Sequence, residues 1–92
     1  MGIKQELKDL KNLNNLIKVM ESENMIEIVE DLTKRKNETI AKIYNLNDSE
    51  LIEIMLLRHF DGLTWDEISS KTGFSKSKLM TLNKRAMDKL KS

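Results

Sequence analysis

The stretch from Thr64 to Leu82, TWDEISSKTGFSKSKLMTL, decides the fold expected for this chain. Its pattern is that of two helices joined by a tight turn. Gly73 allows the positive φ angle that such a turn requires. Ser69 is small enough for the second helix to cross the first closely, and Leu79 and Leu82 hold the second helix in place. We therefore expect a helix-turn-helix.

The face of the second helix that points away from the first is basic and polar. Its members are Lys76, Ser77, Lys78, Met80, Thr81, Lys84 and Arg85. The first turns of a recognition helix reach base edges in the major groove, so Lys76, Ser77 and Thr81 are expected to read bases. Lys78, Lys84 and Arg85 lie on the flanks and are expected to meet phosphates. The alternative is an ordinary amphipathic helix with a solvated lysine face, but the turn spacing favours DNA.

Composition narrows the class of protein. The chain has 92 residues, no cysteine, one histidine, no proline and three glycines. We expect one small, almost wholly helical protein with no disulfide, no metal site and no cofactor. There is no cysteine nucleophile and no glycine-rich phosphate loop, so an enzyme is not expected. No apolar run approaches the ~20 residues of a membrane-spanning helix, and Met1 to Met20 is too charged for a signal peptide, so we expect a cytoplasmic protein without membrane contact.

Charge is distributed unevenly along the chain. Residues 71–92 hold seven basic residues and one acidic residue, a net charge of +6. Residues 47–70 hold one basic and six acidic residues, a net charge of −5. Five acidic residues and no basic one lie in 21–31. The basic C-terminal end is the part expected to approach phosphate.

Apolar periodicity and cap residues predict five helices, an all-α fold. The first runs from Ile3 to about Met20, and the second from Met25 to Tyr44 behind a cap at Ser22 or Asn24. Asn47 with Glu50 forms a capping box for a third helix that ends near Phe60, before the left-handed turn of Gly62. Thr64 with Glu67 forms a capping box for the fourth helix. Ser75 caps the fifth, which ends near Leu90.

Residues 1–45 form an N-terminal helical segment for packing or oligomerisation, and residues 46–92 form the DNA-binding domain. An apolar stripe in the first helix, at Leu10, Leu13, Ile17 and Met20, predicts a homodimer. Asn14 has two interpretations: a buried residue that sets the register of paired helices, or an exposed residue beside the stripe.

Three further features have alternative roles. Trp65 either packs on the third helix or lies along the DNA backbone. Arg58 and His59 either complement the dipole of the third helix or touch phosphate. The run Lys34, Arg35, Lys36 is either a solvated face or a phosphate contact.

Leu46 to Leu90, with the run LLRHFDGLTWDEISSKTGFSKSKLMTLNKRAMDKL, resembles region 4 of bacterial sigma factors. More narrowly, it looks like the small phage transcriptional regulators of the ArpU and RinA type. The resemblance implies base contacts from Lys76, Ser77 and Thr81. It also implies backbone contacts near Thr64, Lys78, Met80, Lys84 and Arg85. Met80 departs from the basic residue common there, and Leu46-Asn47 replaces the usual Leu-Pro.

The chain is therefore expected to be a sequence-specific regulator of transcription that binds double-stranded DNA, derived from a phage or mobile element. Two alternatives remain open. One is an adaptor that binds RNA polymerase or another protein through a region 4-like fold. The other is a small DNA-packaging subunit of a phage.

Overall fold

A computed structural model describes residues 2–91 of the chain. Within that range every regular element is helical, which confirms the expected all-α fold of five helices. The elements are α1 (Ile3–Ser22), α2 (Ile26–Tyr44), α3 (Ser49–Met55) continued by the π-helical turn η1 (Leu56–Phe60), α4 (Trp65–Thr72) and α5 (Lys76–Lys91).

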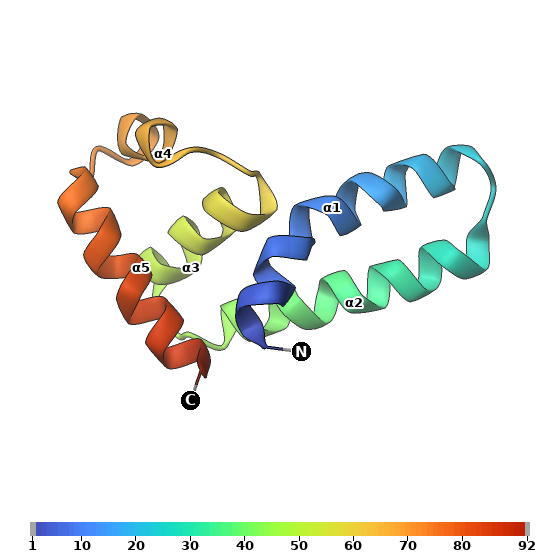
Figure 1. The fold of residues 1–92 in the computed structure, drawn as a ribbon, viewed down its shortest axis with the longest axis horizontal. Helices are drawn as coiled ribbons and strands as arrows, with labels where there is room; N and C mark the ends of the chain where they lie inside the picture. The colour runs from blue at the N-terminus through green and yellow to red at the C-terminus, as the bar shows by residue number, and fades with distance from the viewer. Residues whose placement is uncertain (1, 92) are drawn as a thin grey trace.

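The helices form two parts of different shape (Figure 1). Helices α1 and α2 run antiparallel as a hairpin that projects to one side, and α3, η1, α4 and α5 form a head. The hairpin makes the molecule long, with extents of 43 × 29 × 19 Å. The two termini lie close to the junction of hairpin and head.

A single hydrophobic core joins the hairpin to the head. Leu7 and Leu10 of α1 and Ile43 of α2 belong to the same buried cluster as residues of all the head helices. The head contributes Leu46, Leu51, Ile54, Met55, Leu57, Ile68, Leu79, Leu82 and Ala86. The half of the hairpin nearest the head is therefore packed into the core, and the distal half is not.

Two predicted helix caps are confirmed. The Thr64 hydroxyl accepts a hydrogen bond from the Glu67 N–H, and the Glu67 carboxylate accepts one from the Thr64 N–H, so the capping box is complete. The Ser75 hydroxyl accepts from the Lys78 N–H at 3.1 Å. Both caps are local, because the partners lie three residues apart in the sequence.

Two other predicted caps are wrong. Asp48, not Asn47, caps α3: its carboxylate accepts from the N–H groups of Glu50 and Leu51, while Asn47 takes a left-handed conformation with φ 57°. Neither Ser22 nor Asn24 caps α2, which begins after Met25 without a side-chain cap. Ser22 still belongs to α1, and Asn24, with φ 59°, makes the left-handed turn of the hairpin. Asparagine tolerates this conformation better than most residues, so both asparagines turn the chain rather than cap a helix.

The third helix ends near Phe60 as expected, but its last turn is wider than an α-helical turn. The Asp61 N–H donates to the Leu56 carbonyl, five residues back, at 3.0 Å. Beyond it Gly62 has φ 73°, which confirms the predicted left-handed turn. The Leu63 N–H then donates to the Leu57 carbonyl, and Arg58 donates to the Leu63 carbonyl, so the chain folds back toward α4. Single π-turns of this kind interrupt α-helices as local bulges.

Candidate nucleic-acid interface

The turn between α4 and α5 is closed by side chains of α4. Gly73 has φ 79°, and its N–H donates to the Ser69 carbonyl at 2.9 Å. The Ser69 hydroxyl donates to the Phe74 carbonyl at 2.7 Å, and the Thr72 hydroxyl accepts from the Phe74 N–H at 3.2 Å. Ser69 therefore does more than leave space for a crossing helix, because it also ties the far side of the turn to α4. Sequence spacing alone does not reveal that bond.

Helix α5 is anchored by the residues predicted to anchor it. Leu79 and Ile68 are fully buried and Leu82 is 4% exposed, so α5 presses one face against the core. Ala86 continues that face one turn further and is also fully buried. The opposite face of α5 is consequently held toward solvent in a defined orientation.

The three residues predicted to read bases, Lys76, Ser77 and Thr81, all lie on this exposed face, in the first two turns of α5. The Thr81 hydroxyl donates to the Ser77 carbonyl at 3.1 Å, so its oxygen can still accept a hydrogen bond. Lys76 forms an ion pair with Asp66 of α4. The structure thus brings the three side chains together and shows that one of them has an intramolecular partner.

The residues predicted to contact the DNA backbone are also exposed, and two have partners of their own. Lys78 lies 3.4 Å from the Glu50 carboxylate and 4.0 Å from the centre of the Phe74 ring. Thr64 uses its N–H and its hydroxyl oxygen in the capping box, and its hydroxyl also stabilises the Glu67 carboxylate, so Thr64 is the second of these residues with a partner. Lys84 and Arg85 have no ion-pair partner within residues 2–91.

The capping box also sets the charge at the start of α4. The backbone N–H of Thr64 and then its hydroxyl hold the pKa of the Glu67 carboxyl below its usual value. Asp66 stands next to it in the same first turn. The start of α4 therefore carries two acidic side chains beside Thr64.

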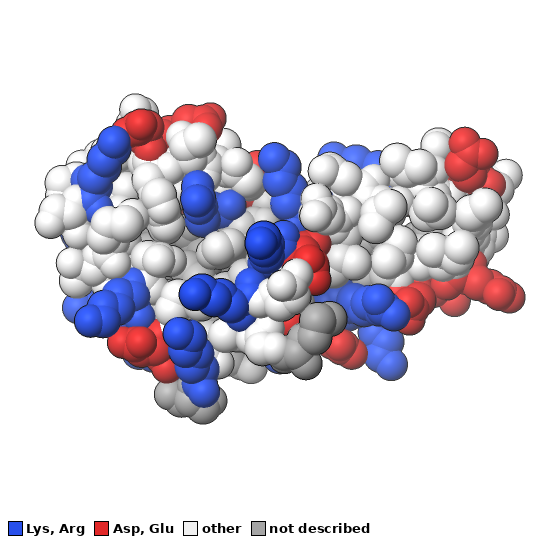
Figure 2. Space-filling model, in the orientation of Figure 1, with Lys and Arg blue, Asp and Glu red and all other residues white. Residues whose placement is uncertain are grey.

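Lys and Arg side chains are spread over the head in the space-filling view, over α5 and across to the N-terminal half of α1 (Figure 2). The acidic residues on the head include those that pair with Lys76 and Lys78. By contrast, the face of the hairpin seen in the same view is almost free of charge over its middle.

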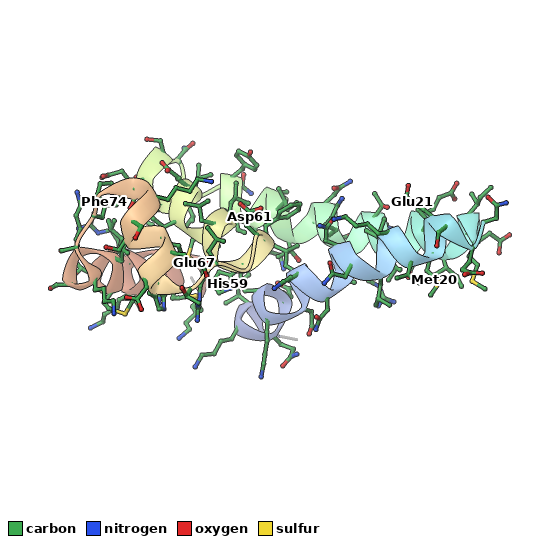
Figure 3. The ribbon with its side chains drawn as sticks, turned by 90° about the horizontal axis from the view of Figure 1, so that it is seen from above. Met20, Glu21, His59, Asp61, Glu67 and Phe74 are labelled. Atoms are coloured by element: carbon green, nitrogen blue, oxygen red, sulfur yellow. The ribbon has the colours of Figure 1, made fainter. Side chains whose placement is uncertain are left out.

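The packing of the head, and not its exposed basic face, involves Trp65, Arg58 and His59. Trp65 is half-buried against the core, with the Arg58 guanidinium 4.9 Å from its ring centre. This confirms packing, the first of the two roles considered for Trp65. His59 is half-buried (Figure 3), and its Nε2 has no hydrogen-bond partner among the described residues. Burial, and then the charge of Arg58, lower its pKa from 6.5 to about 4, so it is neutral at pH 7 and brings no charge to the helix end.

Within residues 2–91, no group of three or more acidic, histidine or cysteine side chains is arranged to hold a metal ion. None of the described helices has both the length and the apolar character needed to cross a membrane.

Comparison with known proteins found no family model, no curated protein and no solved structure that matches this chain.

Proposed function

We propose that this chain is a sequence-specific DNA-binding regulator of transcription that reads the major groove with the first turns of α5. The observation that carries the proposal is the orientation of α5. Its buried leucines fix the helix, and the exposed face presents Lys76, Ser77 and Thr81 side by side. A basic, acid-free face of this kind at the start of a helix suits base edges flanked by phosphates.

The intramolecular ion pairs of this face do not oppose the proposal. Lys76 and Asp66 are both largely exposed, as are Lys78 and Glu50. Exposed pairs contribute about 0–1 kcal/mol, whereas a good base contact supplies ~1–3 kcal/mol of discrimination. For each of these lysines, replacing the carboxylate partner with a DNA base or phosphate is therefore favourable at low salt.

The resemblance to sigma region 4 and to small phage regulators supports the same function and suggests a phage or mobile-element origin. It also supports a location in the bacterial cytoplasm, with double-stranded DNA and RNA polymerase as the proposed partners.

The test is selection of bound duplexes from a random DNA pool at roughly physiological salt. The wild type is compared with a Lys76→Ala, Thr81→Ala variant and with an Asn15→Ala, Asn37→Ala control on the hairpin. An enriched motif for the wild type and the control that is lost in the first variant supports the proposal. No enrichment with any of the proteins overturns it and favours an adaptor that binds polymerase or another protein.

We also propose that the regulator is a homodimer, through a surface that shares only part of the predicted stripe. Leu10 and Ile17 are buried inside the protomer, Leu10 in the core shared with the head, so these two cannot pair with a second copy. Most of the large apolar side chains left exposed lie on the distal half of the hairpin, and Tyr44 and Met80 lie elsewhere. Those on the distal half are Leu16, Val19, Met25, Ile26 and Ile28.

The shape of the hairpin supports this dimer. Met20 and Glu21 lie on opposite sides of α1 (Figure 3), and the side that carries Met20 is the nearly uncharged face of Figure 2. Apolar patches of this kind mark interfaces. Two hairpins packed by this face would form a four-helix bundle.

Mass in solution tests the dimer. At tens of micromolar the wild type is expected at twice the mass of the chain, and a Leu16→Lys, Ile28→Lys variant at the monomer mass. A monomeric wild type contradicts the dimer, and a ring-sized oligomer points to a packaging subunit instead.

A further inference from the structure

Helix α1 has two electrostatically different sides. Its lysines at positions 4, 8 and 11 are spaced by four and three residues, so they share one face of the helix. We name this set the α1 lysine stripe. Glu6 and Asp9 fall on another face. Glu6 pairs with Lys42 of α2 at 2.7 Å, and Asp9 accepts a hydrogen bond from Gln5 at 2.9 Å. The acids of α1 are thus satisfied within the hairpin.

The lysines of the stripe have no such partners. Within residues 2–91, Lys4 and Lys8 are exposed and form no ion pair. Lys11 is exposed as well, although its side chain lies against Gly62: a Cβ at Gly62 would come within 2.7 Å of its Nζ. Among the described residues, Lys4 and Lys8 therefore carry positive charge without a carboxylate partner, while Lys11 has the Glu67 carboxylate in its neighbourhood.

The contact with Gly62 places the stripe next to the candidate interface. Gly62 is two residues before Thr64, which caps α4 and is expected to meet the DNA backbone. The Glu67 pKa is lowered chiefly by its hydrogen bonds with Thr64 and, to a smaller extent, by the charge of Lys11, so Lys11 is close to the start of α4.

The arrangement of helices extends this proximity along the head. In Figure 3, α5 and the N-terminal end of α1 both lie in the lower part of the view, on the side of the molecule that faces the viewer in Figure 1. Figure 2 shows Lys and Arg side chains on this side over α5 and over this part of α1, with uncharged side chains between them. Two lysine-bearing helices therefore border one side of the head, and only one of them belongs to the helix-turn-helix.

We propose that the α1 lysine stripe is a second phosphate-binding element that extends the DNA footprint beyond the helix-turn-helix. The inference rests on the proposed function, because it names the duplex DNA backbone as the occupant. Lys4 and Lys11 are about 10 Å apart along the helix axis, at 1.5 Å per residue. That length corresponds to roughly three phosphates of one DNA strand. The lysines supply affinity without base reading.

The test measures how binding depends on salt, with a random-sequence duplex of about 30 base pairs as the probe. Each phosphate contact contributes about 0.9 to the slope of log affinity against log salt. A Lys4→Gln, Lys8→Gln variant is expected to lower that slope by about 2 and the affinity at low salt on the order of tenfold. The control is Lys18→Gln, an exposed lysine on the distal hairpin, and its slope is expected to stay at the wild-type value.

Lys11 is tested separately because its side chain packs on Gly62. Lys11→Met keeps an unbranched apolar side chain and removes the charge, and it is expected to lower the slope by about 1. Far-UV circular dichroism of each variant checks that the fold is kept.

A second measurement locates the contact. The chain has no cysteine, so Lys8→Cys gives one attachment point for an iron chelate that cleaves nearby DNA. Cleavage of a selected site just outside the segment protected by the helix-turn-helix is expected, with none from Asn37→Cys, an exposed position of α2. If the wild type binds the duplex but the Lys4→Gln, Lys8→Gln variant keeps its slope, this inference alone is overturned. If the wild type binds no duplex at low salt, the proposed function fails with it.

Discussion

At the scale of single residues, backbone conformation and burial explain what the sequence pattern only suggests. Gly73 and Gly62 both have positive φ, but they differ in surroundings. A Cβ at Gly73 would meet no atom within 4 Å, whereas one at Gly62 would meet the side chain of Lys11. The need for glycine at position 73 is thus purely conformational.

Replacing Gly73 with alanine is expected to lower the free energy of unfolding by about 1–2 kcal/mol, because an L-residue is strained at this φ. Gly73→Asn is expected to cost less, since asparagine tolerates the left-handed region. Urea unfolding followed by circular dichroism measures both. Equal losses for alanine and asparagine would contradict the conformational explanation.

His59 is expected to make stability depend on pH. Its pKa is about 4 in the folded protein because of burial and the charge of Arg58, compared with 6.5 in the unfolded chain. Between these values the unfolded chain binds a proton that the folded protein does not. The contribution of neutral His59 to the free energy of unfolding is therefore fully present above pH 6.5. It falls by about 1 kcal/mol as the pH falls toward 4, after allowance for the partial exposure of the ring.

Urea unfolding at pH 7.5 and pH 5 measures this effect in the wild type and in His59→Gln. The carboxylates titrate in both proteins, so the difference between them isolates the histidine. The variant is expected to lose less stability than the wild type on acidification, and an identical loss in the two proteins would exclude His59 as the cause.

At the scale of helices, the position of a cap depends on the entry angle of the chain. Asn47 and Asp48 are both good cap residues, and the sequence pattern with Glu50 favoured the first. The left-handed conformation of Asn47 carries the chain from α2 into the head, and this leaves Asp48 as the residue whose carboxylate faces the free N–H groups of α3.

An Asp48→Ala substitution is expected to cost about 1 kcal/mol, because two N–H groups of α3 lose their acceptor. Asn47→Gly is expected to change stability by less than about 0.5 kcal/mol, since glycine adopts the same left-handed conformation. Thermal unfolding of the two variants decides between the residues. A larger loss for Asn47→Gly than for Asp48→Ala would restore Asn47 as the cap.

At the scale of the whole molecule, the hairpin and the head share one core, so their stabilities should be coupled. Ile43 of α2 is fully buried in the cluster that contains head residues, and Trp65 of α4 packs on the same cluster. The fluorescence of Trp65, the only tryptophan of the chain, therefore detects in the head the effect of substitutions made in the hairpin.

Ile43→Val is expected to lower the free energy of unfolding by about 0.5–1.5 kcal/mol, the usual cost of removing one buried methylene group. Because the core is shared, the loss should be the same whether unfolding is followed by Trp65 fluorescence or by far-UV circular dichroism. A shift seen by circular dichroism alone would mean that the hairpin unfolds separately from the head.

Sequence spacing by itself determined the features whose partners lie within a few residues of each other. The five helices, the left-handed turns at Gly62 and Gly73, the capping box of Thr64 and the anchoring of α5 by Leu79 and Leu82 all follow from such local rules, and the structure has each of them. The base-reading role of α5 remains a prediction.

Only the tertiary structure decided which partners distant parts of the chain provide. It assigned Leu10 and Ile17 to the interior and not to a dimer, paired Lys76 with Asp66 and Lys78 with Glu50, and set Lys11 beside Gly62. The physical reason is that sequence periodicity shows which side of a helix is apolar and which is charged. The orientation of the whole helices decides which residues each side contacts.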